Sequence, residues 1–226
     1  MAGLPDVKQV RSLSKSGLSQ VVVIFEDLPR APGPAVEPAA SPAKPSTPRA
    51  PEDMIWRIER VDAPKSFANM TDRSLVLDGS GHPHVAYGDD HLYHAWYDGS
   101  TWHTEVVDQD WNAAVGEYAA IALDSSGYPH VVYHDFTAHH LKYARFDGSA
   151  WIVETVDSND AGEDTSLMLD SAVHPHISYS SGFHIKTLKY AYHDGNSWQI
   201  STVYATGAVG KYASIALGSA NRPHIA

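Results

Sequence analysis

The sequence predicts an all-β fold, an incomplete β-propeller, and two observations support this prediction. First, a repeat starts at positions 74, 120, 166 and 214, so that successive copies are 46, 46 and 48 residues apart. Second, each copy divides into short segments of alternating polarity, separated by glycine, proline and aspartate turns, as antiparallel strands are. A four-stranded unit with a period of about 40 to 50 residues is typical of a propeller blade.

The four strands of a copy follow a fixed order. An innermost strand ends in aspartate or glycine, and a second strand opens with Pro-His. An aromatic third strand ends in an Asp-Gly turn, which tolerates a positive φ, and a fourth strand starts with tryptophan. We expect structural roles for the repeated positions, which are His84, His130, His176, Asp98, Gly99, Trp102, Asp147, Gly148, Trp151, Asp194, Gly195 and Trp198.

The copies predict three complete blades and part of a fourth. The complete blades cover about residues 66–108, 114–157 and 162–204, and the partial blade covers 209–226. Residues 56–62 match a fourth strand with no blade before it. We expect this lone outer strand to be half of a ring closure whose other half lies beyond residue 226. The incomplete ring should self-associate through its open edge or need its missing portion.

The first 54 residues differ in composition from the repeats. Eight prolines between Leu28 and Pro51 exclude a helix, so residues 28–54 are predicted to form an extended linker of polyproline type. Residues 1–27 are too few to bury a core, and alone they should be poorly ordered. Within them, residues 16–19 have turn composition and residues 20–25 predict a strand.

The N-terminal segment, AGLPDVKQVRSLSKSGLSQVVVIFED at residues 2–27, resembles a stretch of the porter region of heavy-metal efflux pumps of the resistance-nodulation-division class. The resemblance stops where the chain continues as Leu28-Pro29-Arg30 in place of that family's acidic, aromatic helix. It implies a remnant of such a pump with no transport activity of its own. A functional adaptor is the alternative.

The repeats at residues 56–226 resemble the sialidase-like propeller repeats, or BNR repeats, of secreted bacterial and archaeal proteins. In that family an Asp box marks the turn between the third and fourth strands. The segment Asp98-Gly99-Ser100-Thr101-Trp102 and its two copies match the Asp box in position and composition and depart from it in spacing. We expect the aspartate to cap the turn amides. The resemblance implies an extracellular or periplasmic protein, although no secretory signal is recognisable.

The resemblance also raises the question of sialidase activity. Such an enzyme needs three arginines that converge on the substrate carboxylate, a Tyr–Glu nucleophile pair and an acid/base aspartate. Arg73 precedes an innermost strand, but the other copies have Ala119, Thr165 and Ala213 there, and the remaining arginines of the repeats are Arg57, Arg60, Arg145 and Arg222. No catalytic residue is therefore predicted. A fragment of a sialidase-like glycoside hydrolase, completed by missing blades, is the alternative.

The repeated histidines allow two interpretations. One is a ring of imidazoles around the channel, formed by His84, His130, His176 and His224, that binds a metal ion. The other is a structural histidine that opens each second strand and bonds to a turn. Because equivalent atoms of adjacent blades lie far apart and histidine ligands need about 2.0–2.1 Å, we expect the structural role, with no metal site and no cofactor.

The candidate binding residues lie where the copies differ most, in the connections between blades and the loops after second strands, because loops on a rigid scaffold commonly carry function. They are Asp110, Trp111, Asp135, His139, Asp160, Asp164 and His184. An exposed aromatic ring beside carboxylates suits a sugar, and solvated acidic loops with one packed tryptophan are the alternative. The sequence therefore predicts a non-catalytic module that recognises a glycan or a protein outside the cytoplasm.

Other partners are disfavoured by charge and hydropathy. The net charge of −11 argues against the phosphate backbone of a nucleic acid. The apolar run at residues 21–25 is too short to cross a bilayer, so no membrane span is expected.

Overall fold

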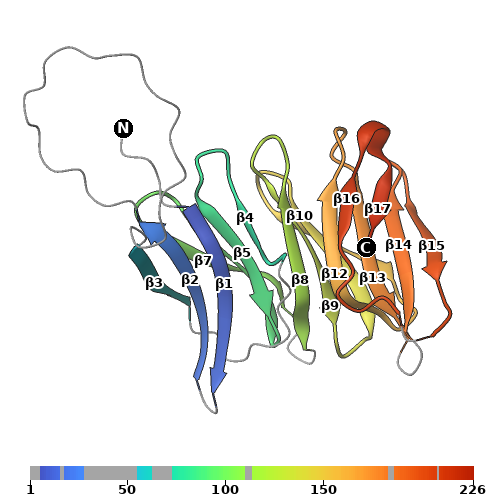
Figure 1. The fold of residues 1–226 in the computed structure, drawn as a ribbon, viewed down its shortest axis with the longest axis horizontal. Helices are drawn as coiled ribbons and strands as arrows, with labels where there is room; N and C mark the ends of the chain where they lie inside the picture. Colours follow the sequence, from blue (N-terminus) through green and yellow to red (C-terminus); the bar gives the residue numbers. More distant parts are fainter. Residues whose placement is uncertain are drawn as a thin grey trace, which may run out of the picture.

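The computed structural model describes residues 6–15, 18–27, 55–62, 73–109, 114–182, 186–207 and 209–226, with side chains from Arg60 onward. These residues form antiparallel sheets that stand side by side in sequence order (Figure 1). No helix in the described ranges is long and apolar enough to span a membrane.

Three of the sheets are four-stranded, which confirms the three complete blades predicted from the repeat. In each of them the strands lie in sequence order from one edge to the other. The first blade consists of β4 (Leu75–Leu77), β5 (Pro83–Gly88), β6 (His91–Tyr97) and β7 (Trp102–Gln109); the second of β8 (Val115–Leu123), β9 (Pro129–Asp135), β10 (His140–Phe146) and β11 (Trp151–Asp157); the third of β12 (Ala161–Leu169), β13 (Pro175–Ser181), β14 (Thr187–His193) and β15 (Trp198–Tyr204).

A two-stranded sheet follows the third blade. It consists of β16 (Ile215–Leu217) and β17 (Pro223–Ile225), with the short 3₁₀ turn η2 (Ser219–Asn221) between them. These two strands correspond to the innermost and second strands of a blade, and they confirm the predicted partial blade.

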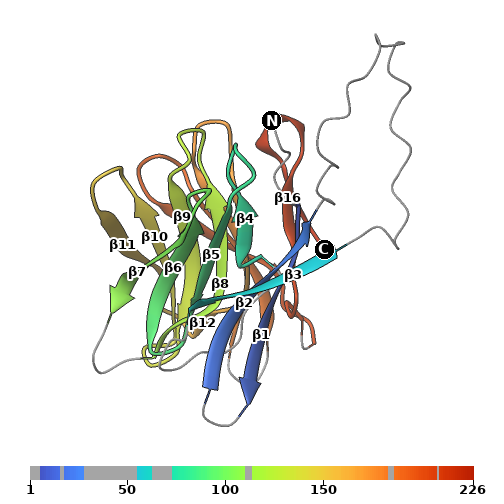
Figure 2. The ribbon, with the colours of Figure 1, turned by 90° about the vertical axis from the view of Figure 1, so that its left-hand side faces the viewer.

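The N-terminal strands form a sheet beside the first blade (Figure 2). It contains β1 (Asp6–Lys15), β2 (Leu18–Asp27) and β3 (Ile55–Asp62). The predicted outer strand is present as β3, but it does not stand alone, because β2 pairs with it along its length. The sequence did not predict this pairing. The proposed linker at 28–54 lies outside the described residues, and the division of the chain at residues 27 and 54 stays a prediction.

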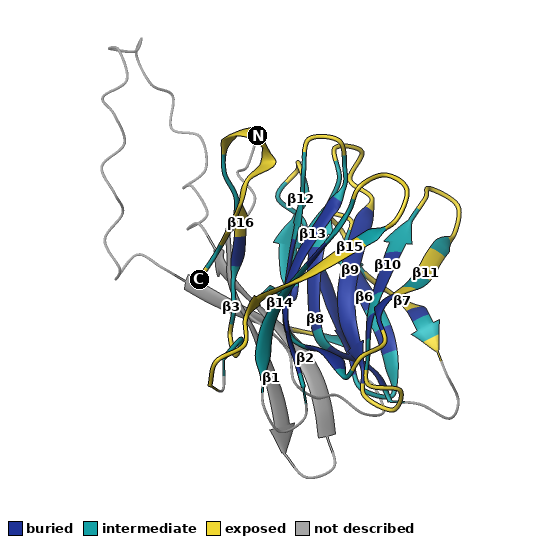
Figure 3. Cartoon of the chain, turned by 90° about the vertical axis from the view of Figure 1, so that its right-hand side faces the viewer, coloured by how far each residue is buried: buried dark blue, intermediate teal, exposed yellow. Residues whose placement is uncertain are grey.

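The hydrophobic core lies between successive blades. One cluster joins Ala86 and Leu92 of the first blade to Val131 and Tyr133 of the second, and an equivalent cluster joins the second blade to the third. The middle strands β9 and β13 are buried at every position because both of their faces are covered, whereas β15 is largely exposed (Figure 3). A blade cannot bury both faces alone, so each one stabilises its neighbours.

The Asp-Gly turns have the same construction in the three blades. In the second blade, Oδ1 of Asp147 accepts hydrogen bonds from the backbone N–H groups of Ser149 and Ala150, each at 2.9 Å. Asp98 and Asp194 make the equivalent bonds. The following glycine has a φ of +95° in all three turns, a conformation that other residues rarely adopt. The tryptophans after these turns pack against the clusters between blades.

A buried tyrosine connects each complete blade to the strand before it. The hydroxyl of Tyr133 donates to Oδ2 of Asp108, the last acidic residue of the first blade, at 2.5 Å. Equivalent bonds join Tyr87 to Asp62 at 2.6 Å and Tyr179 to Asp157 at 2.7 Å. Asp62 of β3 therefore holds the first blade in the way that a complete preceding blade would.

A lysine completes two of these contacts, which we call interblade latches. Lys142 bonds to Asp108, and Lys189 bonds to Asp157 at 2.8 Å. Although burial opposes it, the hydrogen bonds from Lys189 and Tyr179 lower the pKa of Asp157 below its ordinary value. Burial and the bonded carboxylate raise the pKa of each latch tyrosine. The buried charge is thus both paired and hydrogen-bonded, as a stable interior requires.

Removing the hydroxyl of one latch tests its contribution to stability. We expect Tyr133→Phe to lower the free energy of unfolding by about 1–3 kcal/mol, because Asp108 loses a buried donor. Urea titration at fixed pH and temperature measures this value. Tyr212→Phe is the control, because the Tyr212 side chain is 87% exposed. Equal stability of Tyr133→Phe and the wild type would contradict the role of the latch.

The repeated histidines connect the second strand of a blade to the third. Nδ1 of His176 lies 2.6 Å from the hydroxyl of Tyr190, and Nδ1 of His130 bonds to the hydroxyl of Tyr143 in the same way. In the first blade the partner is a second imidazole: Nδ1 of His84 lies 3.0 Å from Nε2 of His94. The histidines were expected to bond to turn backbone. The structure instead gives them side-chain partners on the neighbouring strand.

Burial of these histidines predicts acid sensitivity. Burial lowers the pKa of His130 to about 4, and burial together with the imidazole of His94 lowers that of His84 to about 4; burial also lowers the pKa of His176. The folded state therefore favours the neutral form of imidazoles that titrate near 6.5 in an unfolded chain. Their contribution to stability is complete above pH 6.5 and is lost as the pH falls from about 6.5 to 4.

We expect the free energy of unfolding to fall between pH 7.5 and pH 5, by about 1–2 kcal/mol for each of His84 and His130 and by a further amount for His176. Urea titration at the two pH values measures the difference. The difference should be smaller in His130→Gln and unchanged in the control Tyr212→Phe, because a phenol does not titrate in this range and the residue is 87% exposed. The pKa values of Asp78 and Asp170 are lowered, so these two carboxylates affect stability only below about pH 4. They therefore do not contribute to the stability difference between pH 7.5 and pH 5. A wild-type protein that is equally stable at both pH values would exclude the effect.

Candidate functional site

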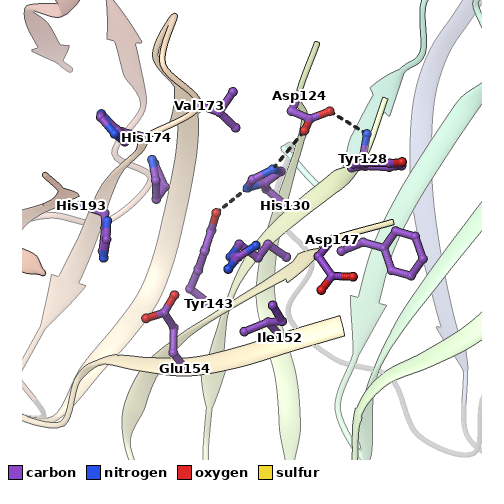
Figure 4. Close-up of a pocket in the computed structure, with 13 residues that line it drawn as sticks. Asp124, Tyr128, His130, Tyr143, Asp147, Ile152, Glu154, Val173, His174 and His193 are labelled. Carbon is purple, nitrogen blue, oxygen red and sulfur yellow. Dashed lines mark hydrogen bonds and ion pairs between the residues drawn. The ribbon is translucent and has the colours of Figure 1, made fainter. Parts of the chain in front are cut away.

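A pocket of about 540 Å³ opens between the second and third blades (Figure 4). The second blade contributes the β8–β9 turn and parts of β9, β10 and β11, and the third contributes the β12–β13 turn and the end of β14. The lining residues are Asp124, Tyr128, His130, Tyr143, Arg145, Phe146, Asp147, Ile152, Glu154, Val173, His174, Pro175 and His193.

Strand register explains why these side chains gather. Arg145 of β10 is paired with His130 of β9 on one side and with Ile152 of β11 on the other. Tyr143 and Glu154 form the adjacent pair, two residues further along the strands. Directly paired residues of a sheet point to the same face, and so do residues two apart on one strand. These five side chains therefore form one surface, which faces the third blade.

The base of the pocket is a fixed polar chain. Oδ1 of Asp124 accepts the backbone N–H groups of Ser126 and Tyr128, each at 2.8 Å. Its Oδ2 lies 3.9 Å from Nε2 of His130, whose Nδ1 bonds to the hydroxyl of Tyr143. Figure 4 shows these contacts in sequence. The third blade has the equivalent chain Asp170–His176–Tyr190, so this part of the pocket is scaffold.

Three charged side chains in the pocket keep hydrogen-bonding capacity. The guanidinium of Arg145 forms no hydrogen bond or ion pair with any described residue. Asp147 uses Oδ1 for its turn, and its Oδ2 bonds to no described residue. Glu154 accepts the indole N–H of Trp198 at Oε2, at 3.1 Å, which leaves Oε1 available. A ligand can therefore meet one strong donor group and two carboxylate acceptors.

The remaining walls are apolar or aromatic. Phe146 also lines the pocket, but its ring lies on the face of β10 opposite Arg145, 5.8 Å from the ring of Tyr128 and 5.7 Å from that of Trp151 between centroids. Ile152 of the second blade is 37% exposed, and Val173 and Pro175 of the third blade also line the pocket. The pocket thus combines a small set of polar groups with apolar surface, as ligand sites usually do.

The corresponding positions of the other blades are filled by aromatic rings. Trp96 stands where the second blade has Arg145, and its ring is stacked between His94 and His103, at 5.1 Å from each. In the third blade, Tyr192 stacks on His176 and Tyr190. The second blade differs from the other two because it has Arg145 in place of a stacked aromatic ring. The pocket lies beside this arginine.

The residues predicted from the sequence lie elsewhere. Asp135, His139, Asp160 and Asp164 belong to the end of the blades where the β9–β10 turn and the β11–β12 connection lie, and the pocket is at the opposite end. Nδ1 of His139 lies 3.9 Å from Oδ1 of Asp160, so two of them come together. Burial and the neighbouring Glu163 raise the pKa of Asp164. Asp110, Trp111 and His184 lie outside the described residues, and a ligand site at this end stays a prediction.

Of the residues singled out from the sequence, His130 and Asp147 line the pocket, and both were expected to be structural. Arg145 was considered only as a member of an arginine triad, and Glu154 was not considered. The signal that could have identified Arg145 is the break in the third-strand repeat, where the other blades have an aromatic residue. Arg73, the other arginine of interest, bonds to Oγ of Ser214 and so connects the first blade to the segment before β16.

No protein-family model and no curated protein matches the sequence, and the resemblance of residues 2–27 to efflux pumps is not supported. Among solved structures, the fold is similar to the leech intramolecular trans-sialidase (13% identity, TM-score 0.52), with 92% of this chain and 32% of that one covered.

Two further solved structures are similar to the chain. A protein of unknown function from Dyadobacter fermentans has 11% identity and a TM-score of 0.51, over 98% of this chain and 74% of that one. A fucose lectin from Kordia zhangzhouensis, solved with methyl-fucoside, has 22% identity and a TM-score of 0.44, over 58% and 97%. The chain thus spans about a third of the leech enzyme's length, and the likeness to that enzyme is one of fold: a sialidase-like β-propeller.

Proposed function

We propose that this chain is a non-catalytic β-propeller module that recognises a carbohydrate through the pocket between its second and third blades. The observation that carries the proposal is the unpaired guanidinium of Arg145, which lies in one pocket with the available oxygens of Asp147 and Glu154. The resemblance of the repeats to those of secreted proteins supports a location outside the cytoplasm.

The chemistry of the pocket suits the alternating surface of a sugar. Hydroxyl groups can donate to the carboxylates of Asp147 and Glu154 and accept from Arg145, and charge-assisted bonds of this kind are strong. The apolar C–H groups of a pyranose ring can pack on Ile152, which is 37% exposed and lies on the same face as Arg145. The volume of about 540 Å³ is within the usual range of about 300–1,000 Å³ for ligand pockets.

The arrangement favours binding over hydrolysis. A glycosidase needs a carboxylic acid that keeps its proton until the leaving group takes it. Hydrogen bonds from Ala150 and Ser149 hold the pKa of Asp147 at about 2, so it stays ionised. The chain Asp124–His130–Tyr143 recurs in the third blade as Asp170–His176–Tyr190, which marks it as scaffold. A fragment of a sialidase-like hydrolase remains the alternative function, and it is distinguished by turnover.

Replacement of Arg145 tests the proposed site. We expect Arg145→Ala to weaken binding at least tenfold, because it removes a charge-assisted donor to the ligand. A glycan array of the whole chain identifies a bound sugar, and calorimetry with that sugar measures the affinity of each variant. Arg60→Ala is the matched control, because Arg60 is an exposed arginine of β3, outside the pocket lining.

Three results would contradict the proposal. The first is an array without any bound glycan, and the second is an Arg145→Ala variant that binds like the wild type. The third is release of free sugar from the bound glycan, which would favour the hydrolase alternative. Circular dichroism and urea titration of both variants exclude loss of fold as the cause of weaker binding.

A further inference from the structure

We infer that this pocket selects sugars that carry no carboxylate, sulfate or phosphate group, and that it rejects acidic sugars such as sialic and uronic acids. The inference rests on the proposed function, and it adds the ligand class. It is carried by the balance of charged side chains that line the pocket.

The fixed charges of the pocket are predominantly negative. Asp124, Asp147 and Glu154 line it, and Arg145 is the one lysine or arginine among the lining residues. His174, a further lining residue, lies with Nδ1 3.4 Å from the carboxylate of Asp170, which adds another negative group behind the wall. An acidic sugar would therefore bring its charge to a surface with more carboxylates than cations, where like charges repel.

The carboxylates are hydrogen-bonded by donors of the scaffold. Asp147 accepts two backbone N–H groups and the hydroxyl of Ser149 at 2.7 Å, which keeps its pKa at about 2. Asp124 accepts two backbone N–H groups through Oδ1. Glu154 accepts the indole N–H of Trp198. Each carboxylate thus accepts at least one hydrogen bond that fixes its position in the pocket, and Asp147 stays ionised.

One guanidinium group is not enough to bind a carboxylate among the carboxylates that line the pocket. Recognition of a carboxylate usually relies on guanidinium groups in bidentate contact, and this pocket offers a single guanidinium, Arg145, in a lining that also contains three carboxylates. Hydroxyl groups fit better, because one hydroxyl can donate to a carboxylate and accept from Arg145. The net charge of −11 adds long-range repulsion of anions.

Neutral and acidic sugars of the same stereochemistry provide the test. Calorimetry of the whole chain at pH 8 compares methyl galactoside with methyl galacturonide, methyl glucoside with methyl glucuronide, and asialo with sialylated glycans. At this pH ordinary imidazoles are uncharged. We expect the neutral member of any pair that binds to have at least tenfold higher affinity. An acidic member that binds equally or more tightly would overturn the inference and leave carbohydrate binding intact.

Other results separate the two proposals. An array on which all bound glycans are acidic overturns the inference alone. An array with no bound glycan overturns the proposed function and, with it, the inference. The ratio of affinities within a pair decides the inference for any sugar that binds, so the identity of the natural ligand need not be known.

Neutralising the acidic wall tests its cause. In Asp147→Asn/Glu154→Gln, the preference for the neutral member should fall from at least tenfold to below threefold, because the repulsion is removed while acceptors of the same size remain. Asp194→Asn is the matched control, because Asp194 holds the same turn in the third blade and does not line the pocket. A double variant with the wild-type preference would show that the carboxylates do not set selectivity.

Discussion

Face-to-face burial between blades, with a tyrosine–aspartate bond inside each interface, is the interaction on which the rest of this structure depends. A single four-stranded sheet has two apolar faces and cannot hide them alone. The bond between Tyr133 and Asp108 sets the position of one blade on the next, and Tyr179 repeats it with Asp157. Asp62 does the same for the first blade, so the N-terminal sheet takes part in the stack.

The same regularity makes a binding pocket possible where the repeat changes. Equivalent rows of side chains face each interface, and they contain stacked rings in the first blade, with Trp96 between two imidazoles. In the second blade Arg145 occupies that position and carries a charge that needs solvent or a ligand. The proposed site thus lies where the blades share the same strands and differ at one strand position, Arg145. It does not lie in the loops that vary most between the copies.

The sequence predicts the fold well because its signals are local. Tryptophan after an Asp-Gly turn marks the start of the fourth strand, and β7, β11 and β15 begin at those tryptophans. The pairing of β2 with β3 is a long-range contact for which the pattern has no signal. The pocket was missed for a related reason, because the opening of an interface at Arg145 depends on the packing of two sheets, which strand periodicity does not encode.

The position of the pocket also gives it rigid walls. Its two blades are joined by the latch of Asp157, whose side chain is 1% exposed and bound by Lys189 and Tyr179. At the interface after the third blade Tyr204 takes the position of this aspartate, and the described residues there form no such latch. Its described contacts include the bonds from Ile215 to Ser166 and from Asn221 to Asp170, each at 3.2 Å. A site between latched blades loses less conformational entropy when a ligand binds, which favours the second interface over the third for recognition.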